Sequence, residues 1–238
     1  MEIYHLESVH STNLKLMELS KKNAKSWTVV STFDQTAGKG YSGNEWISES
    51  GKNIAVSVLI VSELSYSDLV FFNQWLCNSV AEYLKGFSDQ VFVKWPNDII
   101  IGEKKVCGIL VETHKSVNEL NIISGIGLNV NQTNFKLLPK AGSMSTQTGR
   151  NFDLEEILSG LLTTLKNSYI QIQNKEWEKI SSTYNHQLFR LNQISDFETE
   201  NQEFKGIIRG VDDSGQLIVE KLNGEQIKFR HKEIELKY

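Results

Sequence analysis

Four β-rich runs follow one another between residues 91 and 130, and the connections between them are short. The runs read VFVKW, DIII, KVCGILVET and NIISGIGLNV, with PND, GEKK and HKSVNE between them. Two parallel strands need a crossover of about a dozen residues or more, usually a helix. These connections are too short for that, so the sequence predicts a mixed, largely antiparallel sheet.

Helical periodicity flanks these strands. Apolar residues recur at helical spacing from 67 to 87, and further helices are predicted from 153 to 172 and from 176 to about 188. Ser11-Thr12-Asn13 precede LKLMEL, an arrangement typical of a capped helix start. The fold class is therefore α+β, with helices backing the sheet.

The last fifty residues differ from the rest. They alternate with period two, and Asp213-Ser214-Gly215 and Asn223-Gly224 are strong hairpin signals. We expect a small β-barrel domain over residues 189–238, appended to a body formed by residues 1–188.

Composition excludes several classes of protein. The net charge of -4 provides no positive field to hold a DNA backbone. The longest apolar run, residues 54–61, is far shorter than the roughly 20 residues of a membrane span. The first ten residues lack the features of a signal peptide, so we expect a cytoplasmic protein. Cys77 and Cys107 lie in apolar contexts and are expected to be buried, reduced thiols.

Residues 38–43 match the glycine pattern G-x-G-x-x-G. A dinucleotide site needs a helix after these glycines, because the helix amino terminus holds the pyrophosphate, and no helix is predicted here. A phosphate-binding Walker loop fails as well, since Asn44 stands where that motif has lysine. The simple interpretation is a glycine-rich connection between two strands.

Three other motifs change that interpretation. KWPND at 94–98 ends a strand, KKVCGILVE at 104–112 places Gly108 inside one, and GIGLNVN at 125–131 contains two more glycines. Glycine inside a strand is destabilising and marks a place where a ligand or another backbone comes close.

Together with STN at 11–13 and QTAGKGYSGNEW at 35–46, these motifs resemble those of biotin protein ligases in order and spacing. The resemblance covers essentially the whole chain. It implies a catalytic domain related to class II aminoacyl-tRNA synthetases and a C-terminal SH3-like barrel. It also implies two reactions: biotin and MgATP form biotinyl-5'-AMP and pyrophosphate, and a lysine of a biotin carboxyl carrier domain then receives the biotinyl group.

The resemblance also implies roles for single residues. Lys105 would bridge the biotin carboxylate and the α-phosphate, with Asp98 and Lys39 as further catalytic residues. The implied biotin-binding residues are Ser11, Thr12, Asn13, Gln35, Gly38, Lys39, Gly40, Tyr41, Lys105, Gly108 and Gly127. The implied ATP-binding residues are Lys39, Trp46, Lys94, Asn97, Lys105 and Asn129. Magnesium binds largely through nucleotide phosphates, so no protein metal ligands are named.

The glycine loop departs from the family pattern. The usual loop is arginine-rich, of the form G-R-G-R-x-G-R, whereas residues 38–44 contain Lys39 as their single cation. Lysine lacks the bidentate fork of arginine, so we expect weaker retention of the adenylate.

Two other functions stay open. A lipoate ligase or octanoyltransferase shares the fold, although KWPND and the terminal barrel argue against it. A non-catalytic biotin or nucleotide binding module is disfavoured by the presence of Lys105 and Asp98 together. A DNA-binding winged helix is not expected, because STN begins at residue 11.

The sequence decides less about partners. Lys232 and Lys237 are candidates for receiving the carrier, or simply part of a solvated basic edge. The chain is expected to be a monomer or a homodimer, in which strands near residues 119–127 pair across a two-fold axis. The identity of the carboxylase is not determined.

Overall fold

The computed structural model describes residues 1–40, 43–115, 119–135 and 138–238, which form two compact units. The first consists of Met1–Tyr66 and Lys104–Thr164, and the second of Ser67–Glu103 and Leu165–Tyr238. Tyr41, predicted to contact biotin, lies outside the described residues. The domain boundary expected at residue 189 falls inside the second unit and stays a prediction.

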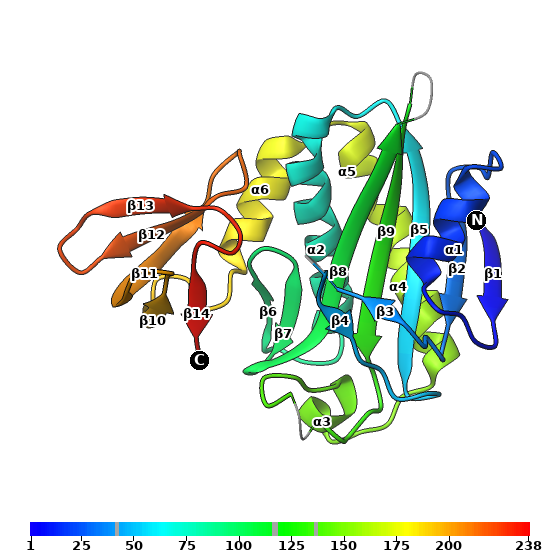
Figure 1. Ribbon diagram of the computed structural model, residues 1–238, viewed down its shortest axis with the longest axis horizontal. Helices are drawn as coiled ribbons and strands as arrows, with labels where there is room; N and C mark the ends of the chain where they lie inside the picture. The colour runs from blue at the N-terminus through cyan, green and yellow to red at the C-terminus, as the bar shows by residue number, and fades with distance from the viewer. Residues whose placement is uncertain (41–42, 116–118, 136–137) are drawn as a thin grey trace. The chain divides into compact units, whose positions relative to one another are not determined.

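A mixed sheet forms the centre of the first unit (Figure 1). Its strands lie in the order β1 (Glu2–Leu6), β2 (Thr28–Thr32), β5 (Asn53–Ser62), β9 (Leu120–Asn129) and β8 (Lys104–Lys115). β1 and β2 are parallel, with a helix between them in sequence, while the other neighbours are antiparallel. The structure confirms the predicted mixed sheet. Strand β1 was not predicted, because four of its five residues are exposed and form no apolar pattern.

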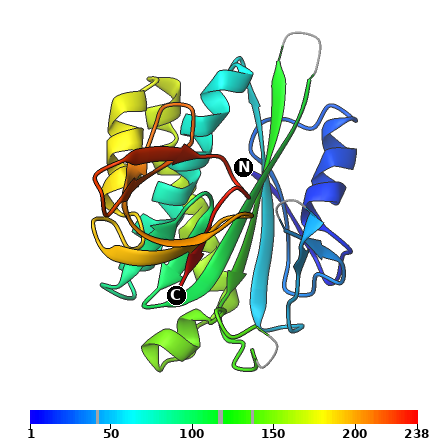
Figure 2. The same cartoon turned by 60° about the vertical axis from the view of Figure 1, so that its left-hand side comes forward.

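Helix α1 (Thr12–Ser20) lies against one face of this sheet (Figures 1 and 2). Leu16 packs in a buried cluster with Val30, Leu59 and Ile123. The helix begins as the sequence predicts, since Ser11 is its N-cap and accepts a hydrogen bond from the Leu14 amide at 3.4 Å.

The face that carries Ile123 continues beyond the start of α1 with much smaller residues. Side chains alternate along a strand, so Ile123, Gly125 and Gly127 share one face of β9. Their register partners on β5 are Leu59, Ser57 and Ala55. On this face the sheet therefore carries large apolar side chains under α1 and only small residues beside the first turn of α1.

The glycine pattern of residues 38–43 begins in a small hairpin. The segment lies between β2 and β5, as predicted, but it contains two short strands that were not predicted: β3 (Gly38–Lys39), which pairs antiparallel with β4 (Glu45–Trp46). The short helix α3 (Met144–Thr148), which begins with a capping box from Ser143 and Thr146, was not predicted.

The second unit contains the long helix predicted from 67 to 87. A 3-10 turn at Tyr66–Asp68 precedes α2 (Leu69–Lys85), and the KWPND turn joins β6 (Val91–Lys94) to β7 (Asp98–Ile101). The helix predicted over 153–172 is divided at Tyr169, where the chain tightens, into α4 (Leu154–Ser168), most of which belongs to the first unit, and α5 (Ile170–Gln173) in the second. α6 (Trp177–His186) follows. No helix in the described ranges is long and apolar enough to cross a bilayer.

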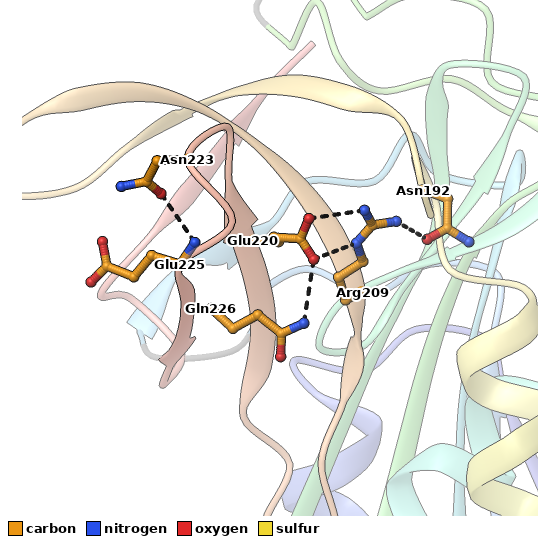
Figure 3. A network of polar contacts seen from close by, with 6 residues as sticks. All are labelled: Asn192, Arg209, Glu220, Asn223, Glu225 and Gln226. Atoms are coloured by element: carbon orange, nitrogen blue, oxygen red, sulfur yellow. Dashed lines mark hydrogen bonds and ion pairs between the residues drawn. The ribbon is translucent and has the colours of Figure 1, made fainter.

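The C-terminal strands form a separate antiparallel sheet, visible in Figures 1 and 2. Its order is β13 (Gln226–Phe229), β12 (Leu217–Lys221), β11 (Glu203–Val211), β10 (Ile194–Glu198) and β14 (Glu235–Lys237). Alternate side chains such as Phe197 and Val219 are buried. Across β11 and β12, Arg209 binds both carboxylate oxygens of Glu220, and its Nη1 donates to Asn192 (Figure 3). The predicted class, α+β with a C-terminal all-β part, is confirmed.

Candidate active site

A polar cluster occupies the small-residue surface at the start of α1. Gln35 Oε1 accepts a hydrogen bond from the backbone amide of Thr12 at 2.9 Å and lies 3.2 Å from the Thr12 hydroxyl oxygen. Ser57 Oγ lies 2.7 Å from Thr12 Oγ1 and 2.5 Å from Asn13 Oδ1. Gly125 makes room for this arrangement, because a Cβ there would collide with the Asn13 amide. The structure therefore brings together Thr12, Asn13 and Gln35, three of the residues predicted to bind biotin.

The cluster ends on a carboxylate that was not predicted. Asn13 Nδ2 donates to Glu112 Oε2 at 2.7 Å and to the Leu110 carbonyl at 3.4 Å. Glu112 lies on the same face of β8 as Gly108 and Leu110, because these residues alternate along the strand. A glutamate four residues after a glycine in the same predicted strand, and therefore on the same face, was the available signal. Ser57 was missed as well, since a buried strand serine has no distinguishing pattern.

An indole ring fills the depression beside the polar cluster. Gly108 and Gly127 are register partners on β8 and β9, and Trp46 lies over both. A Cβ at Gly127 would lie 2.6 Å from Trp46 Cε2, and one at Gly108 would lie 2.9 Å from Trp46 Cζ3. The strand glycines thus admit a close neighbour, which in this structure is a tryptophan side chain. We call Trp46, Gly108 and Gly127 the indole cradle.

Lys105 reaches the indole cradle. Its Nζ lies 5.6 Å from the centre of the Trp46 ring, close enough for a cation–π contact. The Lys105 backbone is held on both sides, because its amide donates to the Lys140 carbonyl at 2.8 Å and its carbonyl accepts from Gly142 at 2.9 Å. The neighbouring Lys104 Nζ instead donates to the Pro139 carbonyl at 2.7 Å. The two adjacent lysines therefore have different surroundings.

Two buried polar atoms in this region lack partners within the described residues: Trp46 Nε1, a donor, and Asn129 Oδ1, an acceptor. The nitrogen of the same side chain, Asn129 Nδ2, donates to the Gly142 carbonyl at 2.9 Å. Buried polar atoms are nearly always hydrogen-bonded, so these two are ready for a ligand. A purine base carries both donors and acceptors and has a flat face, so the region fits a nucleotide.

The predicted biotin-binding residues Gly38, Lys39 and Gly40 lie in and beside the β3–β4 hairpin and differ in exposure. Gly38 is buried against the Trp46 backbone, and the Gly40 amide donates to Asn44 at 2.7 Å. Lys39 is exposed. The hairpin therefore carries Trp46 inward and Lys39 outward.

Lys94, Asn97 and Asp98 belong to the second unit. Lys94 and Asp98 face each other across the turn between β6 and β7, and Asn97 is buried. Lys94 Nζ lies 5.8 Å from the centre of the Tyr238 ring. Burial raises the pKa of Tyr238 to about 12, and the charges of Asp98 and nearby glutamates add to the effect. Asp98 therefore lies close enough to Lys94 and Tyr238, in its own unit, for its charge to act on them.

A protein metal site is not formed by the described side chains. No group of three or more His, Cys, Asp and Glu residues in these ranges is arranged to hold a metal ion. A magnesium ion that enters with nucleotide phosphates needs no such cage.

Comparison with known families matches both parts of the chain. Residues 5–129 match the biotin/lipoate A/B protein ligase family, and residues 193–234 match the biotin protein ligase C-terminal domain. A biotin–[acetyl-CoA-carboxylase] ligase from Paracoccus denitrificans is 28% identical over 236 residues, with 93% of this chain and 95% of the relative covered. The bifunctional ligase/repressor BirA of Bacillus subtilis is 28% identical, with 93% of this chain and 70% of the relative covered.

Solved structures agree with the sequence relatives. The biotin protein ligase of Aquifex aeolicus in complex with biotin and ATP is 26% identical and superposes with a TM-score of 0.81, covering 99% of this chain and 98% of that chain. The resemblance to biotin protein ligases that the sequence motifs indicate is confirmed. With more than half of its residues matching the family model, this chain belongs to the biotin/lipoate A/B protein ligase family.

Proposed function

We propose that this chain is an ATP-dependent biotin protein ligase. One observation carries the proposal: a single sheet face of the first unit combines a polar cluster, an indole over two glycines and a lysine beside that indole. The polar cluster suits a cyclic urea, the indole suits a purine, and the lysine suits the anionic groups that react between them. The named relatives support biotin over lipoate as the acid.

In the first step, a carboxylate oxygen of biotin attacks the α-phosphate of ATP, and pyrophosphate leaves. Negative charge develops on the phosphoryl oxygens, and catalysis consists mainly of positioning and charge stabilisation. Lys105 supplies the fixed cation for this step. Magnesium bound to the phosphates would neutralise further charge. Trp46 stacks on the adenine, and the amide of Asn129 contacts it.

Ser11, Thr12, Asn13 and Gln35 bind the ureido ring of biotin. Gly108 and Gly127 leave a space above the strands that the Trp46 indole fills in this structure, and biotin reaches the two glycines when that ring moves aside. Gly38, Lys39 and Gly40 close over the adenylate, which excludes water from a mixed anhydride that would otherwise hydrolyse.

In the second step, the amine of a carrier lysine attacks the biotinyl carbonyl, and AMP leaves. Asp98 orients that lysine, while Lys94 and Asn97 contact the nucleotide. The substrate is a biotin carboxyl carrier domain of a carboxylase, and the protein acts in the cytoplasm without contacting DNA, consistent with its net charge of -4. We further propose that residues 1–188 form the catalytic domain and residues 189–238 the barrel domain.

The test is transfer of biotin to a purified apo carrier domain in the presence of ATP and magnesium. Biotinylated carrier, detected by mass, with stoichiometric AMP is the expected result. Controls omit ATP, or replace the acceptor lysine of the carrier by arginine. Biotin binding without adenylate formation would identify a binding module, and modification with lipoate or octanoate in preference to biotin would identify the other branch of the family.

A further inference from the structure

We infer that Glu112 is a specificity-determining positioning residue, which acts through Asn13 and Ser57 to fix the direction in which the Thr12 hydroxyl donates its hydrogen bond. The inference rests on the proposed function and deepens it. Glu112 itself contacts Asn13, one residue into α1, and a chain of three contacts connects it to the Thr12 hydroxyl.

The direction is set at the carboxylate. A carboxylate accepts hydrogen bonds and donates none, so Asn13 must turn its Nδ2 toward Glu112, at 2.7 Å. The second hydrogen of Nδ2 points to the Leu110 carbonyl at 3.4 Å. Asn13 Oδ1 is then obliged to face Ser57. A flipped amide would place an oxygen against two acceptors.

The orientation of Asn13 in turn fixes the orientation of the Ser57 hydroxyl. Asn13 Oδ1 can only accept, and it lies 2.5 Å from Ser57 Oγ, so the single hydroxyl hydrogen of Ser57 is used there. The Ser57 oxygen, 2.7 Å from Thr12 Oγ1, must then accept from the Thr12 hydroxyl, whose single hydrogen is therefore not given to Gln35 Oε1, 3.2 Å away. Ser57 is fully buried, and a reversed hydroxyl would leave two facing acceptors without a proton.

Thr12 is the end of the chain of directions. With its hydrogen donated to Ser57, the Thr12 hydroxyl oxygen is left as an acceptor. Gln35 is oriented independently of Glu112, because its Oε1 accepts from the Thr12 backbone amide at 2.9 Å. A urea N–H is a matching donor for the Thr12 oxygen, whereas the alkyl end of octanoate offers none.

The decisive experiment replaces Glu112 by leucine and measures the dissociation constants of biotin, octanoate and ATP by calorimetry. We expect biotin binding to weaken by about 10- to 100-fold, because one wrongly oriented buried amide costs that much, and octanoate and ATP binding to change by less than threefold. The ratio of biotin to octanoate affinity is the readout, since general loss of structure would weaken all three. Ser57→Ala should shift the same ratio by a smaller factor.

Two further variants complete the test. Glu112→Gln retains an oxygen that can accept from Asn13 and should restore most of the biotin affinity. Glu18→Gln removes a carboxylate from an exposed ion pair on the same helix α1 and should leave all three constants unchanged. Glu112→Leu binding biotin as tightly as wild type, or weakening all three ligands equally, would overturn the inference. Wild-type protein that binds no biotin would overturn the proposed function itself, before any variant is compared.

Discussion

The polar cluster and the indole cradle share one sheet face but differ in whether their buried polar atoms have hydrogen-bond partners. In the polar cluster, the side chains from Gln35 to Glu112 bond to one another. In the indole cradle and beside it, Trp46 Nε1 and Asn129 Oδ1 are buried with no partner in the part of the chain that the structure describes.

This difference indicates how each region meets its ligand. A closed network holds its groups in place before binding, so little order is gained when the ligand arrives. Unsatisfied buried atoms are destabilising, and a ligand that pairs them gains the energy that the free protein lacks. We therefore expect the polar cluster to be rigid and preformed, and the indole cradle to be completed by the nucleotide.

The largest expected effect comes from Lys105, the cation at the edge of the indole cradle. Lys105→Ala should lower kcat/KM for biotin-dependent pyrophosphate exchange by about 10³-fold, since it removes the charge that stabilises the transition state. The dissociation constant of biotin should change much less, because the polar cluster is intact. Lys22→Ala, an exposed lysine just after α1, is the control and should match wild type. A Lys105→Ala enzyme with a tenth of wild-type activity would contradict the assigned role.

Gly127→Ala tests whether the indole truly occupies the cradle. The new methyl would stand 2.6 Å from the ring, so Trp46 must move. We expect the free energy of unfolding to fall by about 1–3 kcal/mol, as for other overpacked sites, and the tryptophan fluorescence to shift. Trp46→Ala should relieve the clash, so the double variant Gly127→Ala/Trp46→Ala should lose less stability than the sum of the singles. Simple additivity would mean that the ring and the glycine do not meet in solution.

Asp212 belongs to another network of hydrogen-bonded side chains, directly after strand β11 of the C-terminal sheet and far along the chain from the polar cluster. Burial alone would raise its pKa, but hydrogen bonds from Lys228, Ser214 and backbone amides of Ser214 and Gln216 lower it to about 2. A depressed pKa adds stability at pH values above the unfolded-state pKa, near 4, and that stability is lost as the pH falls toward 2. After allowance for solvent screening, Asp212→Asn should cost about 1 kcal/mol at pH 7.

The measurement for Asp212 is urea unfolding of wild type and Asp212→Asn at pH 7 and at progressively lower pH. The two curves should converge between about pH 4 and pH 2. A difference that stays constant over this range would show that the carboxylate charge is not responsible.

The smallest effect is expected for Arg209, whose network in Figure 3 lies on the surface of the C-terminal sheet. Exposed ion pairs contribute little, so Arg209→Ala should lower Tm by roughly 1–3 °C and leave biotin transfer unchanged. Lys205→Ala breaks a more exposed single contact with Asp196 and should have no measurable effect. Loss of transfer activity in Arg209→Ala would show that this surface takes part in function.

Much of the fold is predictable because its signals are local. Short connections between 91 and 130 exclude crossover helices, the capped start at Ser11 marks α1, and period-two alternation marks the C-terminal strands. Strand β1 and helix α3 escape such prediction. The first is mostly exposed and is defined by pairing with β2, and the second is a single short turn defined by its cap.

The residues of the candidate site likewise divide into those that local sequence patterns predict and those that they do not. The motifs around Lys105, Gly108 and Gly127 stand out in the sequence, because glycines inside strands are unusual and the motifs occur in a recognisable order. Ser57 and Glu112 do not stand out. Their importance depends on the register of β5, β9 and β8, which places Ser57 opposite Gly125 and Leu110 opposite the same glycine.

The sequence by itself therefore determined the class of fold and the family, and it singled out Lys105 as the proposed reactive lysine, since each follows from patterns within short segments. Only the tertiary structure decided that Trp46 fills the space above Gly108 and Gly127, and that Glu112 closes the network begun by Gln35. The physical reason is distance along the chain. These contacts join residues 60 to 100 positions apart, and strand register and helix placement, rather than any local propensity, bring them within hydrogen-bonding or van der Waals range.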